Sequence, residues 1–153
     1  MLKVHKLIAT CFGIGYIGKG GGTVAAIVCC MAWYLVQVQV AGLHFLGQLL
    51  VTLFIIITGI WSATKLDPYW GKDNGKIVID EVAGMCVTLL FIPVQWKYLL
   101  VGLILFRFFD IAKPLLIRKT EKLPLGWGVM LDDLLAGLYS NLLLQVVVLS
   151  NFL

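Results

Sequence analysis

Five acidic residues form three short groups in the second half of the chain: Asp80 with Glu81, Asp110 alone, and Asp132 with Asp133. Carboxylates that leave bulk water are costly to desolvate and repel one another, so a cluster of them needs a compensating positive charge. Basic side chains or a metal ion can supply that charge. A ligand set made only of oxygen atoms suits Mg²⁺, Ca²⁺ or Mn²⁺. The acids therefore predict a site for a hard cation if the fold brings them together.

Basic residues lie close to the same acids along the chain. Arg107 and Lys113 are each three residues from Asp110, a spacing that allows ion pairs within one helix. Arg107 lies in an apolar run and therefore requires an anionic partner, which is either Asp110 or a ligand phosphate. Lys113 and Arg118 flank Pro114, where we expect the helix to end.

The acids also have a plain structural interpretation. Asp132 would cap the last helix, and Asp80 or Glu81 would do the same for an earlier one. Adjacent acids on a helix point about 100° apart, so one of each pair faces the site. On the last helix, small or polar residues recur every four positions: Asp133, Gly137, Asn141 and Gln145. That stripe favours Asp133 as the inward acid, and it is equally suited to helix packing.

The composition requires a membrane around these residues. Charged residues make up 13% of the 153-residue chain and hydrophobic residues 61%, whereas soluble domains contain about 25% charged residues. Residues 20–64 contain no Asp, Glu, Lys or Arg, and such a run is long enough for two membrane crossings. We predict an all-α polytopic membrane bundle of four to five embedded helices, with residues 1–153 forming a single domain.

The charge distribution orients the bundle. We expect spans over residues 22–40, 43–64, 78–95, 98–112 and 131–151. With the N-terminus inside, ten of the twelve basic residues fall on the cytoplasmic side, as the positive-inside rule requires. Lys97 alone falls outside. The same topology places all eight acids at the cytoplasmic side, so the five acids named above converge from three helices near the inner headgroups.

A glycine-rich segment, FGIGYIGKGGGT (Phe12–Thr23), resembles two nucleotide-binding motifs. The dinucleotide interpretation fails because no strand precedes it and no acid follows at the required distance. The P-loop interpretation fails because no Ser or Thr follows Lys19. Close helix packing is the plain alternative. The topology places the segment beside the acids, where backbone N–H groups could hold a phosphate. The candidate phosphate-binding residues here are Lys19, Gly20, Gly21, Gly22 and Thr23.

Other protein classes fit the pattern less well. A transporter or channel would carry ionisable residues at mid-membrane, whereas here they gather at one face. A phospholipid-synthesising phosphotransferase would need a DG…G…D…D arrangement, which is absent. A non-catalytic membrane subunit with an interfacial cation site stays open at this point. The four cysteines show no CxxC spacing, and we expect buried thiols.

Three stretches of the chain together resemble one protein family. They are KDNGKIVIDEVAGM (Lys72–Met85), FRFFDIAKPLLIR (Phe106–Arg118) and GWGVMLDDLLAG (Gly126–Gly137). They resemble the IViDExxGM, FRxxDxxKPxPI and GxGxMxDDxxAG patterns of the phosphatidylglycerophosphatase A family, which are small bacterial membrane lipid phosphatases. The glycine segment differs from the family's proline-containing PxxPGTxGS, and Leu116 replaces the second proline of KPxPI.

The resemblance implies Mg²⁺-dependent removal of the terminal phosphate of phosphatidylglycerophosphate at the bacterial inner membrane, with the active site on the cytoplasmic side. It implies a metal and catalytic set of Asp80, Glu81, Asp110, Asp132 and Asp133. It also implies that Arg107, Lys113 and Arg118 bind the phosphate, with Asp73 in a supporting role. Attack by water and formation of an aspartyl-phosphate both stay open. We expect a lipid partner and no nucleic acid; the oligomeric state, including a homo-oligomer, is open.

Overall fold

The computed structural model describes residues 2–39, 45–71, 74–114, 116–120 and 123–150. These residues form seven α-helices and one short 3₁₀ helix, without a β-strand among them, so the predicted all-α class is confirmed. In chain order the elements are α1 (Leu2–Ala9), η1 (Ile14–Ile17), α2 (Gly21–Gln39), α3 (Phe45–Trp70), α4 (Ile79–Leu89), α5 (Trp96–Ala112), α6 (Ile117–Thr120) and α7 (Gly126–Leu149).

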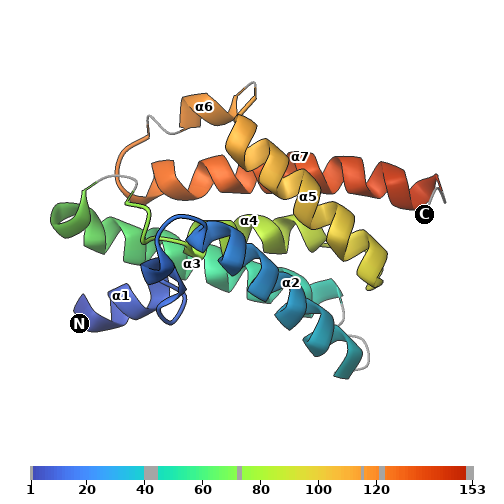
Figure 1. Cartoon of the computed structure of the whole chain (residues 1–153), viewed down its shortest axis with the longest axis horizontal. Helices are drawn as coiled ribbons and strands as arrows, with labels where there is room; N and C mark the ends of the chain where they lie inside the picture. The colour runs from blue at the N-terminus through green and yellow to red at the C-terminus, as the bar shows by residue number, and fades with distance from the viewer. Residues whose placement is uncertain (1, 40–44, 72–73, 115, 121–122, 151–153) are drawn as a thin grey trace.

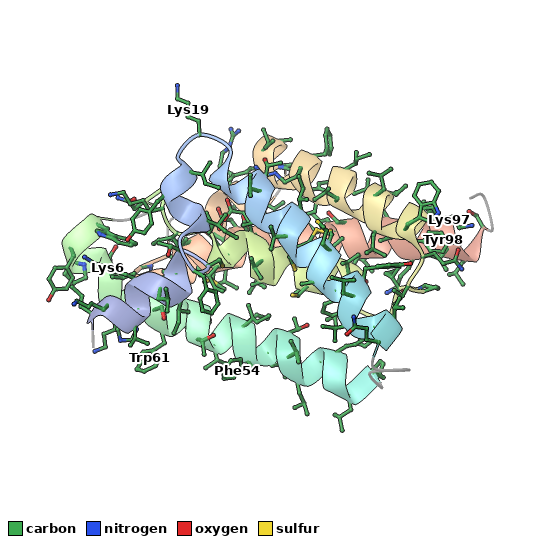
Figure 2. All side chains as sticks on the ribbon, turned by 60° about the horizontal axis from the view of Figure 1, so that its bottom comes forward. Lys6, Lys19, Phe54, Trp61, Lys97 and Tyr98 are labelled. Carbon is green, nitrogen blue, oxygen red and sulfur yellow. The ribbon has the colours of Figure 1, made fainter. Side chains whose placement is uncertain are left out.

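The long helices run between two opposite ends of an elongated bundle (Figure 1). One end holds α1, α6 and the start of α7, and the other holds the end of α7 and the start of α5. Figure 2 shows Lys97 at the far end from Lys6. This separation agrees with the topology in which Lys97 alone lies outside.

Among the described residues, three helices are long and apolar enough to cross a membrane: α2, α3 and α7. The other two predicted spans correspond to α4, with 11 residues, and α5, with 17 residues. A crossing needs roughly 20 residues, so α4 cannot cross a full bilayer as a helix alone. The predicted embedded helices therefore exist, but they differ in length.

Besides the end of α4, which comes at Leu89 and not at the predicted 95, two other helix ends differ clearly from the prediction. The predicted span 43–64 continues as α3 to Trp70, with Pro68 inside the helix. The last helix begins at Gly126, five residues before the predicted 131, so Asp132 is an interior residue and not a cap. Hydropathy marks where a chain leaves the hydrocarbon, whereas a helix continues into the headgroup region as long as its backbone stays hydrogen-bonded.

The chain leaves α4 through a turn at Leu90 and Phe91, and a side chain from α7 satisfies backbone carbonyl groups at this helix end. Asn141 Nδ2 donates to the carbonyl oxygens of Thr88 and Leu90, at 2.9 and 2.8 Å. Gln145 Nε2 donates in turn to Asn141 Oδ1 at 2.7 Å. Non-helical backbone at membrane depth is tolerated only where such partners exist. Three residues of the predicted inward stripe of α7, Asp133, Gly137 and Asn141, are buried, and the fourth, Gln145, is half-buried. Asn141 supports the backbone at the end of α4.

Two glycines let α4 and α7 cross with their backbones in contact. A Cβ atom built on Gly137 would lie 2.3 Å from the Gly84 carbonyl oxygen. Each glycine follows an aspartate by four residues, in the matching segments DEVAG (Asp80–Gly84) and DLLAG (Asp133–Gly137). Residues four apart lie on one helix face, so the crossing lies one turn from both aspartates.

Gly137→Ala is expected to lower the free energy of unfolding by about 1–3 kcal/mol, the usual cost of overpacking. The clash is with backbone atoms, which cannot rotate away as a side chain can. Thermal unfolding in detergent measures the effect. Gly102→Ala on α5 is the matched control, because the atoms nearest its added methyl group belong to side chains, at 3.0–3.3 Å. Equal melting temperatures for the two variants would contradict the backbone crossing.

Candidate active site

Asp80 and Glu81 occupy the first turn of α4, where the helix dipole favours negative charge. Neither residue is the N-cap, which is Val78. Asp80 Oδ1 accepts the Glu81 backbone N–H at 3.1 Å, and the Asp80 side chain is buried, with 8% exposure. The backbone just before this turn is anchored to the end of α1, because the Val78 N–H donates to the Ala9 carbonyl oxygen at 2.9 Å.

Asp133 of α7 meets these two acids. Asp80, Glu81 and Asp133 each offer one carboxylate oxygen, and these oxygens all lie within 4.8 Å of one another. Glu81 Oε2 is buried and has no hydrogen-bond partner in the described part of the chain. Buried polar atoms are almost always partnered, so this oxygen is suited to a bound ligand. Three converging carboxylates fit a hard cation such as Mg²⁺.

Asp110 and Arg107 form an ion pair within the last two turns of α5. Arg107 Nη1 donates to Asp110 Oδ2, and the two side chains are 20% and 13% exposed. Asp110 is also close enough to Asp133 and Glu81 to interact with them electrostatically. The Arg107 Nε atom is buried without a hydrogen-bond partner in the described residues. The guanidinium is therefore held by Asp110 and still offers a donor to an anion.

Lys113 and Asp132 form a second ion pair, which joins α5 to α7. Lys113 Nζ lies 2.7 Å from Asp132 Oδ2, with the side chains 23% and 7% exposed. The left-handed backbone of Lys113 (φ 44°) ends α5 just before Pro114, as predicted, and its N–H donates to the Phe109 carbonyl oxygen. Spacing along the chain suggested only Asp110 as a partner, because a contact 19 residues away leaves no local pattern.

Lys113→Met is expected to lower the free energy of unfolding by about 1–3 kcal/mol, because it removes a charged partner from the buried Asp132. Chemical or thermal unfolding in detergent measures the loss. The double variant Lys113→Met/Asp132→Asn should recover most of the stability, since the buried charge is then gone. Lys119→Met, at an exposed position on α6, is the control. A Lys113 variant as stable as the Lys119 variant would contradict the pair.

The glycine segment meets the acids at one residue, Gly22. A Cβ atom built on Gly22 would lie 1.8 Å from Glu81 Oε1, so the Glu81 carboxylate packs against the first turn of α2. This helix begins at Gly21, one residue before the predicted start of the span at residue 22. Gly21 N–H donates to the Gly18 carbonyl oxygen at 2.9 Å. The positive end of the α2 dipole therefore faces Glu81.

The other predicted phosphate-binding residues are distributed around this centre. Gly20 is exposed, with a left-handed backbone (φ 96°), and Thr23 is half-buried in the first turn of α2. Lys19 is exposed and points away from the bundle (Figure 2). Arg118 is exposed on α6. The supporting acid Asp73 lies outside the described residues.

A thiol pair lies beneath the acids and was not foreseen. Cys29 Sγ is 3.6 Å from Cys86 Sγ, which joins α2 to α4; both thiols are buried and reduced, as expected of structural cysteines. Cys11, in the turn after α1, is partly buried. Burial, with smaller contributions from Cys29 and Glu81, raises the pKa of Cys11 to about 12. A thiol that stays protonated at neutral pH is a poor nucleophile, so Cys11 is not a candidate nucleophile.

Comparison with known proteins shows which family this chain is similar to. The family model described as phosphatidylglycerophosphatase A matches residues 7–148. A phosphatidylglycerophosphatase A of Haemophilus influenzae is 36% identical over 92% of this chain and 86% of its own, and that of Escherichia coli is 32% identical over 92% and 81%. A Bacteroides thetaiotaomicron protein, provisionally described as a phosphatidylinositol-3-phosphatase, is 40% identical over 92% of this chain and 91% of its own. No solved structure matches the chain.

The matched region contains every converging acid described above and extends over nearly the whole chain. The relatives also match along most of their own length, so the similarity is not limited to one motif. This excludes the transporter and non-catalytic interpretations left open by the sequence. The protein is a phosphoric monoester hydrolase of the membrane, and the chain belongs to the phosphatidylglycerophosphatase A family.

Proposed function

We propose that the protein hydrolyses the terminal phosphomonoester of phosphatidylglycerophosphate, releasing phosphatidylglycerol and inorganic phosphate at the cytoplasmic face of the membrane. One observation carries the proposal. Glu81 Oε2 and Arg107 Nε are buried without hydrogen-bond partners in the described residues, one an acceptor and the other a donor. A divalent cation together with a phosphate satisfies both atoms at once.

The cation that we propose is Mg²⁺, held by Asp80, Glu81 and Asp133. These ligands are oxygen atoms only, and Mg²⁺ is commonly held by one or two carboxylates together with substrate phosphate. When bound there, Mg²⁺ would offset the negative charge of the carboxylates and stabilise the charge that develops on the phosphate. Binding would also relieve the repulsion among buried acids from two different helices.

The remaining residues bind and orient the substrate. Arg107 donates from Nε to a phosphate oxygen, while Asp110 holds the guanidinium through Nη1. An aspartate of the cluster accepts a proton from an attacking water, whose oxygen bonds to phosphorus as the bond from phosphorus to the glycerol oxygen breaks. The departing glycerol oxygen takes up a proton. Lys113 is held by Asp132 at the edge of the cluster, where its charge favours an anionic headgroup.

The position of the site suits a lipid substrate. The acids lie at the start of α4, near the end of α5 and in the first third of α7, and the long apolar helices extend toward the opposite end of the bundle (Figure 1). A phosphate on a lipid headgroup reaches this level while its acyl chains stay in the hydrocarbon. The excess of basic residues supports the cytoplasmic face of the inner membrane as the location.

Phosphate release from phosphatidylglycerophosphate by the purified protein in detergent tests the proposal. We expect turnover with Mg²⁺, a loss of at least about 100-fold in EDTA, and full recovery when Mg²⁺ is added back. Undiminished turnover in EDTA would contradict the metal assignment. The 40% identity to a protein described as a phosphatidylinositol-3-phosphatase makes phosphatidylinositol 3-phosphate the second candidate substrate. If kcat/KM for that lipid exceeded kcat/KM for phosphatidylglycerophosphate, the proposed substrate would be wrong, although the protein would still be a lipid phosphatase.

A further inference from the structure

An apolar groove of about 360 Å³ runs along the surface between α2 and α5. Its walls include Ile27, Met31 and Leu35 from α2 and Trp96, Leu100 and Leu103 from α5. No charged residue contributes to its lining. The volume lies in the range of ligand-sized cavities, about 300–1,000 Å³. In the bilayer, this groove opens to hydrocarbon.

Both walls of the groove belong to helices that also carry residues of the candidate active site. At its N-terminal end α2 carries Gly22, against which Glu81 packs. At its C-terminal end α5 carries Arg107 and Asp110. The two helices run in opposite directions, so these site residues lie at the same end of the seam between α2 and α5. A lipid whose phosphate reaches the acids has this seam directly beneath its headgroup.

The groove is shorter than the hydrocarbon core and lies within reach of a chain that starts at the site. Ile27 and Leu35 lie about 8 and 20 Å along α2 from Gly22, at 1.5 Å per residue. Leu103 and Trp96 lie about 10 and 21 Å along α5 from Asp110 by the same rise. The walls thus cover an interval of about 11–12 Å, well under half of the roughly 30 Å hydrocarbon core. A transmembrane helix in the groove would need a surface along the whole core, so a single hydrocarbon chain suits the groove better.

We propose that this groove binds one acyl chain of the phosphate-bearing lipid while the phosphate lies at the acids. The proposal rests on the proposed function and adds a hydrophobic subsite to it. Contact with the groove gives the enzyme a preference for long acyl chains, because burial of each additional methylene group contributes to affinity. The walls also align the headgroup, since a chain held between α2 and α5 directs the attached phosphate toward Arg107.

Two leucine variants test the groove. Leu100→Trp fills it, whereas Leu142→Trp on α7 adds the same bulk outside the groove lining. The two leucines are 50% and 54% exposed, and both lie at similar depth, about 15 Å from Asp110 and 14 Å from Asp133. Binding of dipalmitoyl and dihexanoyl phosphatidylglycerophosphate is measured in EDTA by native mass spectrometry, and hydrolysis is measured separately with Mg²⁺.

We expect Leu100→Trp to weaken binding of the dipalmitoyl lipid about tenfold, and to raise its KM in parallel with little change in kcat. Binding of the dihexanoyl lipid should be unchanged, and Leu142→Trp should resemble the wild type with both lipids. If the two variants showed the same preference for the long-chain lipid, the proposed acyl-chain site would be wrong. The proposal would also be wrong if Leu100→Trp changed the oligomeric mass of the protein and weakened binding of both lipids equally. That result would identify the groove as an interface between copies of the chain. Because binding is measured without turnover, absence of hydrolysis in the wild type would count against the proposed function alone.

Discussion

Asp133→Asn is expected to reduce Mg²⁺-dependent phosphate release at least about 100-fold, the scale of losing one preorganised electrostatic contact. Asp133 is 4% exposed and shares the centre with Asp80 and Glu81. Asparagine keeps the shape of the side chain and removes one negative charge from a cluster that repels itself. The variant should therefore be at least as stable as the wild type in EDTA, although it is inactive.

Differential scanning fluorimetry in detergent distinguishes loss of the cation site from unfolding of the variant. Mg²⁺ should raise the melting temperature of the wild type, because a ligand that binds only the folded state stabilises it. The Mg²⁺-dependent shift should be lost in Asp133→Asn. Asp67→Asn is the control, since Asp67 lies near the end of α3 and is not part of the three-acid group. An active Asp133→Asn protein with a normal Mg²⁺ shift would exclude this centre.

Gly22→Ala is expected to lower kcat at least about tenfold, through the position of Glu81 and not through any contact with substrate. The added methyl carbon would lie 1.8 Å from Glu81 Oε1, so the carboxylate must leave the position in which it meets Asp80 and Asp133. The Mg²⁺ concentration that gives half-maximal rate should rise as well. Gly75→Ala, where nothing lies within 4 Å of the new Cβ atom, should behave as the wild type.

A double variant distinguishes displacement of Glu81 from damage to α2. Glu81→Asp shortens the side chain by one methylene group, which relieves the clash with an alanine at position 22. The substitution should therefore cost less activity in the Gly22→Ala background than in the wild type, a non-additive result expected of residues in contact. Additive losses would show that Gly22 acts independently of Glu81.

The sequence predicts the main elements and the acids because both depend on simple patterns. Long uncharged runs require membrane helices, and the distribution of basic residues brings Asp80, Asp110 and Asp133 to one end. The four-residue stripe on the last helix identifies Asp133 as inward. In the structure, Asp133 and Asn141 are both buried, and Asp133 meets Asp80 and Glu81.

Other features depend on contacts that leave no local pattern. Gly22 and Glu81 are 59 positions apart, and a glycine required for a side-chain contact has the same appearance in a sequence as one required for a turn. The partner of Lys113 is on α7, so spacing along α5 suggested the nearer Asp110. Helix ends in the headgroup region were missed for a different reason. Hydropathy shows where the chain leaves the hydrocarbon, but it does not show where backbone hydrogen bonding stops.

The backbone crossing at Gly84 and Gly137 bears on which cation, small or large, fits between the carboxylates. Asp80 and Asp133 each precede one of these glycines by one helical turn, so the separation of the two carboxylates follows the distance between the helix axes. Carboxylate oxygens approach Mg²⁺ to about 2.0–2.1 Å and Ca²⁺ to about 2.3–2.6 Å. At the cation site proposed above, a crossing as close as two glycine backbones allow would therefore favour the smaller ion. A bulkier residue at the crossing would move the two helices apart and shift selectivity toward Ca²⁺.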